Sequence, residues 1–131
     1  LFRSAPVNSI WEGSGNVQCL DVIRAIHKQP DCYQSFLKEL EQVRGGHPLF
    51  DQVLNDLKDL SPEDLTPVSA RYWVEKMAKA MQAAQLIQIG TDLISDAFCE
   101  ARLASGSGLC FGQLPGHLNF KSILNRSFQP D

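Results

Sequence analysis

The chain has 131 residues, of which 44% are hydrophobic and 21% charged, a composition typical of a folded globular domain and not of a disordered segment. Its formal net charge is -3 with acids and bases interspersed, so composition gives no sign of the strongly basic surface of a nucleic-acid-binding domain. No run approaches the roughly 20 consecutive apolar residues that a membrane span needs.

Two helices are predicted in the first third of the chain. Apolar residues recur at helical spacing over about 16–29, where Asn16 is the predicted N-cap and Pro30 the predicted stop. A second apolar stripe covers 33–43, and the pair Gly45-Gly46 is expected to end that helix. Both stripes predict amphipathic helices that bury one face.

A third stripe covers 50–60, with Pro48 near its first turn. The segment "SPEDL" then predicts a new helix start, with Ser61 as the cap and Pro62 in the first turn. Its two acidic residues would face the positive end of the helix dipole.

The longest predicted helix runs from about residue 67 to 104. Its apolar positions alternate by four and three, which is the spacing of a helix-packing seam with small residues in the middle. The seam consists of Trp73, Met77, Ala80, Ala84, Ile87, Thr91, Ile94, Phe98 and Ala101. It would pack on the earlier helices of the same chain, which we favour, or on a second copy. Gly90 is expected to introduce a bend or a frayed turn.

The remaining chain predicts little regular structure. "SGSG" at 105–108 ends the long helix, and one short helix is expected over about 119–125. No strand pattern of useful length appears. The predicted fold is therefore all-α: a helical bundle of up-and-down helices with one long C-terminal helix.

Several kinds of catalytic and metal site are not indicated. The three histidines are far apart in sequence, and no H-E-x-x-H, P-loop or G-x-S-x-G motif occurs. The four cysteines form no C-x-x-C pair, so we predict no metal site. Free thiols in a reducing cytoplasm are favoured over disulfides, which the count alone leaves open.

The opening stretch carries the most specific motif. Trp11-Glu12-Gly13-Ser14 is an aromatic residue and an acid before a glycine-rich turn, and the helix after it holds Gln18 and Arg24. By physics alone, an acid at this position is a helix-capping residue with a favourable dipole contact. The segment "APVNSIWEGSGNVQCLDVIRA" nevertheless resembles the C-terminal active-site segment of the acyl-CoA dehydrogenase family, most closely its AidB-like branch.

That resemblance implies a chemistry for the turn. In the family, the glutamate removes the α-proton of an acyl-CoA thioester while a hydride leaves the β-carbon for the flavin. Glu12 would be the catalytic base, and its backbone amide would donate a hydrogen bond to the thioester carbonyl. Trp11 and Glu12 would contact the substrate, and Gly13 and Ser14 would contact the FAD cofactor. Cys19 stands where many family members have an arginine.

The resemblance also implies a larger parent. We expect a fragment of an FAD-dependent oxidoreductase, with residues 1–29 ending its helical domain and residues 30–131 forming an AidB-like helical extension. The parent would be a cytoplasmic homo-oligomer that takes an acyl-CoA substrate and an electron acceptor. The fragment alone is expected to hold no FAD and to be inactive.

An alternative function is a DNA-binding or oligomerisation module with little dehydrogenase activity. Arg71, Lys76, Lys79 and Arg102 on the long predicted helix are the candidate phosphate contacts. Residues 61–105 contain four basic and six acidic residues, however, which favours an ordinary solvated surface.

Overall fold

A computed structural model describes residue 7 and residues 15–104 and 117–127, and all its regular elements in these ranges are helical. This confirms the predicted all-α class. The elements are α1 (Gly15–Lys28), α2 (Pro30–Glu41), α3 (Pro48–Lys58), the short 3-10 turn η2 (Pro62–Asp64), α4 (Ala70–Ile89), α5 (Asp92–Arg102) and α6 (Phe120–Ser127).

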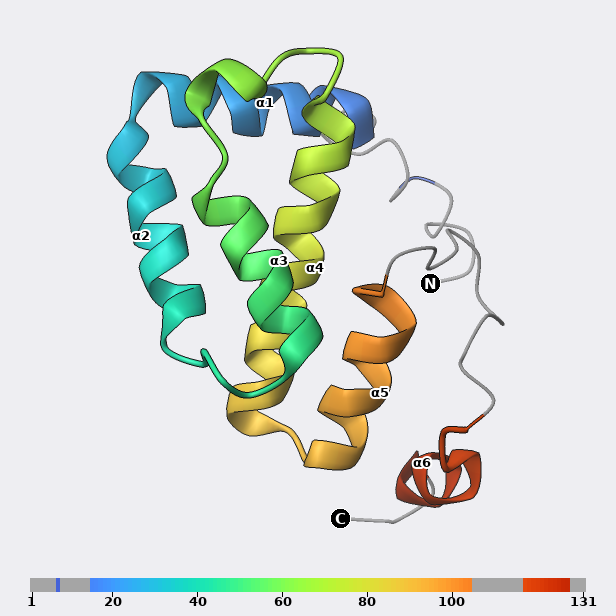
Figure 1. Cartoon of the computed structure of the whole chain (residues 1–131). Coiled ribbons are helices and arrows are strands. Elements are labelled where there is room, and N and C mark those ends of the chain that lie inside the picture. The colour runs from blue at the N-terminus through green and yellow to red at the C-terminus, as the bar shows by residue number, and fades with distance from the viewer. Residues whose placement is uncertain (1–6, 8–14, 105–116, 128–131) are drawn as a thin grey trace.

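Four helices run up and down beside one another, and α1 lies across one end of them (Figure 1). The core between them contains the fully buried Leu40 of α2, Phe50, Leu54 and Leu57 of α3, and Cys99 of α5. Burying a large apolar side chain contributes roughly 1.5–3 kcal/mol, so the stripe of α3 supplies much of the stabilisation. Burial also raises the pKa of the Cys99 thiol to about 11, with smaller contributions from two neighbouring carboxylates.

The predicted single long helix is wrong: residues 67–104 form two helices, α4 and α5, separated at Gly90 and Thr91. The chain reverses there, and α5 runs back beside α4 (Figure 1). Gly90 caps α4, and a Cβ at this position would lie 2.2 Å from the carbonyl oxygen of Leu86. Only glycine permits that close approach, so the predicted bend is a complete break.

The start predicted at Ser61 is confirmed, with Ser61 as the cap and Pro62 in the first turn, but the element that begins there is short. Pro62–Asp64 form only a 3-10 turn, and α4 begins at Ala70. The Asp64 carboxylate accepts hydrogen bonds from the backbone N–H (3.0 Å) and the hydroxyl (2.8 Å) of Ser61. These bonds from Ser61 lower the pKa of the Asp64 carboxyl. The turn is therefore closed on itself and does not continue into the helix.

The seam residues of α4 pack inside the chain. Met77, Ala80 and Ala84 are buried, and α4 contacts α1, α2, α3 and α5. Small side chains there let the neighbouring helices approach closely. The favoured intramolecular packing of this part of the seam is therefore confirmed.

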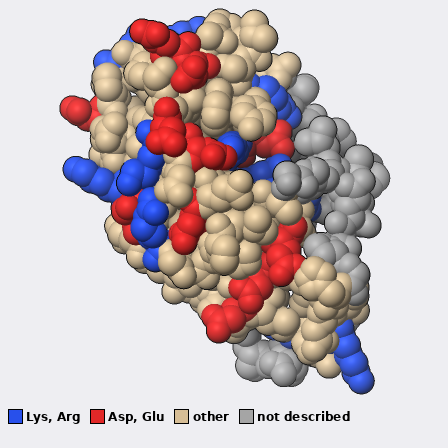
Figure 2. All heavy atoms as spheres, viewed as in Figure 1, with Lys and Arg blue, Asp and Glu red and all other residues tan. Residues whose placement is uncertain are grey.

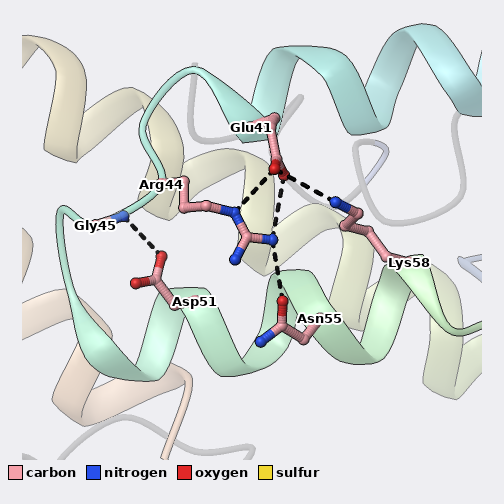
Figure 3. Close-up of polar contacts among 6 residues, drawn as sticks. All are labelled: Glu41, Arg44, Gly45, Asp51, Asn55 and Lys58. Atoms are coloured by element: carbon pink, nitrogen blue, oxygen red, sulfur yellow. Dashed lines mark hydrogen bonds and ion pairs between the residues drawn. The ribbon is translucent and has the colours of Figure 1, made fainter.

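The connection between α2 and α3 is held by polar contacts (Figure 3). Glu41 accepts hydrogen bonds from Arg44 Nε (2.9 Å) and Lys58 Nζ (3.3 Å), and Arg44 also donates to Asn55 Oδ1 (3.0 Å). Gly45 adopts φ of 88°, the left-handed region that glycine favours. The link turns the chain so that α3 lies antiparallel beside α2.

Candidate active site

The predicted active-site residues lie outside the described residues. They are Trp11, Glu12, Gly13 and Ser14. The structure describes the helix that follows them directly, α1, which begins at Gly15. The first turn of α1 is therefore the described part of the chain that follows the motif in sequence.

The inner face of α1 is part of the common core. Cys19, Ile23 and Ile26 follow one another by four and three residues and are all buried, and α1 packs on α2 and α4. Cys19 is 7% exposed, so the residue that stands where many family members have an arginine belongs to this packing face. Among the described residues, Cys19, Cys32 and Cys99 form no disulfide with one another, and Cys110 lies outside these residues.

The first turn of α1 meets the first turn of α4. Arg71 Nη1 donates a hydrogen bond of 3.2 Å to the side-chain oxygen of Asn16. A Cβ added to Gly15 would lie 2.6 Å from Arg71 Nη1, so the guanidinium lies against the backbone of Gly15. The first turn of α4 thus lies beside Gly15, the first residue of α1.

Three large hydrophobic residues of α1 are partly exposed. Val17, Leu20 and Val22 are 47%, 37% and 38% exposed, although each is a large hydrophobic residue. The same helix also exposes the ion pair of Arg24 and Asp21, and Val22 lines a groove between α1, α2 and α4, so α1 is an amphipathic helix. Within the described residues only the inner face is covered.

An apolar groove of about 400 Å³ lies between α1, α2 and α4. Val22 and Ile26 line it from α1, Phe36 from α2, and Met77 and Met81 from α4. Its walls are almost wholly hydrophobic, so the groove can accept an apolar group but offers little to orient a reacting one.

A smaller cavity of about 170 Å³ lies beside it, near His27 and Pro62. The His27 side chain is 3.0 Å, through Nε2, from the carbonyl oxygen of Pro62. This histidine joins the end of α1 to η2, which is a structural contact and not a catalytic arrangement.

The basic residues proposed as phosphate contacts do not form a separate basic surface. Lys76 pairs with Asp56 (2.5 Å) and Lys79 with Glu75 (2.8 Å). Lys76 Nζ also lies 5.4 Å from the centre of the Trp73 ring, a cation–π contact. On the face drawn in Figure 2, acidic side chains flank the basic ones. This arrangement gives no support to nucleic-acid binding.

The described part of the chain contains no group of three or more His, Cys, Asp or Glu side chains placed to hold a metal ion. Among the same residues no helix is long and apolar enough to cross a membrane. No buried side-chain nitrogen or oxygen in the described ranges lacks a hydrogen-bond partner.

Comparison with known proteins gives two relatives. The chain is 30% identical over 109 residues to the acyl-CoA dehydrogenase-like protein AidB of Escherichia coli (strain K12), a match that covers 83% of the chain. It is 30% identical over 129 residues, 97% of the chain, to "Acyl-CoA dehydrogenase family member 11" of Caenorhabditis elegans. The chain is related in sequence to the acyl-CoA dehydrogenase family. This confirms the resemblance noted in the opening motif.

The relationship covers only part of each relative. The chain spans 20% of the length of the Escherichia coli protein and 19% of that of the Caenorhabditis elegans protein. No protein-family model matches the chain, and no solved structure matches it.

Sequence reasoning missed the role of Arg71 in the fold. It singled out this residue as a phosphate contact on the basis of its charge, whereas its guanidinium contacts Asn16 and Gly15. Arg71 and Asn16 are 55 positions apart in the sequence, so no local pattern predicts the pairing.

Proposed function

We propose that this chain is the C-terminal part of an FAD-dependent acyl-CoA dehydrogenase-like protein in which Glu12 is the catalytic base. The observation that carries the proposal is similarity to two members of that family along 83% and 97% of the chain, together with the motif Trp11-Glu12-Gly13-Ser14.

The chemistry needs a carboxylate at the turn. The Glu12 carboxylate takes the α-proton of the acyl-CoA thioester, and the electron pair of that C–H bond forms the α,β double bond as a hydride leaves the β-carbon. FAD, when bound, supplies the acceptor for that hydride. The Glu12 backbone N–H donates to the thioester carbonyl, whose oxygen gains negative charge as the proton is removed.

The neighbours of Glu12 suit this role. Trp11 would supply an apolar wall beside the carboxylate, and a carboxylate that is partly removed from water is a stronger base. Gly13, which has no side chain, allows backbone to approach the thioester and cofactor closely. Ser14 leads into the first turn of α1. Most of the flavin site would come from parts of the parent outside this chain.

Partly exposed apolar residues of α1 suit a larger parent. Val17, Leu20 and Val22 expose large hydrophobic surfaces on the helix that follows the base. In the proposed parent these side chains pack against its remaining helices, which would hold α1 and the turn before it on both sides. The parent would be an oligomer with an acyl-CoA substrate.

The test uses the full-length protein loaded with FAD. Under anaerobic conditions, straight and branched acyl-CoA thioesters are added and the flavin absorbance is followed. Wild type is expected to bleach, Glu12→Gln to retain FAD without bleaching, and Glu63→Gln, a change at an exposed acid of η2, to behave as wild type. If wild type binds FAD and no thioester bleaches it, the proposed activity is wrong.

A further inference from the structure

No further inference is drawn: the strongest candidate, the apolar groove between α1, α2 and α4 with the exposed thiol of Cys32 in its wall, is an unpartnered apolar face, and nothing in the described part of the structure shows what covers it.

Discussion

The Tyr33 hydroxyl of α2 donates a hydrogen bond of 2.6 Å to the backbone carbonyl oxygen of Leu57 in the last turn of α3. The last four carbonyls of a helix have no partner within it, so the tyrosine satisfies an acceptor that would otherwise be buried alone. Both residues are buried. The bond joins two helices at the end of the bundle that α1 covers.

Tyr33→Phe should lower the free energy of unfolding by about 1–2 kcal/mol, because it leaves the Leu57 carbonyl unsatisfied. Urea denaturation of the chain measures this, with Tyr72→Phe as the control. The Tyr72 side chain is 60% exposed, so its loss should change stability by less than about 0.5 kcal/mol. Equal effects of the two substitutions would contradict the assigned contact.

The same tyrosine gives an alkaline pH dependence. Burial raises the pKa of Tyr33 from 10.0 to about 12, so the unfolded chain loses this proton first as pH rises. The stabilisation is complete below pH 10.0 and is lost as pH rises toward about 12. Tyr33→Phe should therefore show a shallower fall in stability over that interval than wild type. Parallel curves would refute this explanation.

Gly90→Ala should destabilise the chain by about 1–3 kcal/mol, because the added methyl group must displace the Leu86 carbonyl at the end of α4. Gln85→Ala, an exposed change in the same turn of the helix, is the control and should cost less than about 0.5 kcal/mol. Thermal unfolding followed by circular dichroism distinguishes them. Were Gly90→Ala neutral, α4 and α5 would tolerate a continuous helix at this point.

Glu41 predicts an acid-sensitive link between α2 and α3. The hydrogen bond from Arg44, with a further contribution from Lys58, lowers the pKa of the Glu41 carboxyl. A lowered pKa stabilises the folded chain above the pKa of the unfolded state, and that stability is lost as pH falls through the folded value.

Glu41→Gln should accordingly lower the melting temperature near neutral pH and flatten its decline toward acid pH. The difference from wild type should shrink in 1 M NaCl, since this ion pair is solvent-accessible. Glu63→Gln is the control at an exposed position of η2. A difference that persists unchanged at low pH would show that charge is not its cause.

Local sequence determined helices α1, α2 and α3 of this protein. In α1, α2 and α3, apolar residues recur every three or four positions. Pro48 lies at the start of α3, as predicted. These signals lie within one or two helical turns, and backbone hydrogen bonds also join residues four apart. The opening motif, read from contiguous residues, likewise gave the family relationship that the two relatives confirm.

Tertiary structure determined the contacts between helices, which local patterns do not predict. Gly90 reads as a bend, but whether a helix bends or reverses depends on what the following segment can pack against, and α5 packs back on α4. Arg71 reads as a surface cation, yet it contacts Asn16 across 55 residues. Such pairings arise when whole helices pack together, and this packing depends on side chains that are far apart in the chain. Local sequence therefore determines where a helix forms, and the tertiary structure determines which helices it contacts.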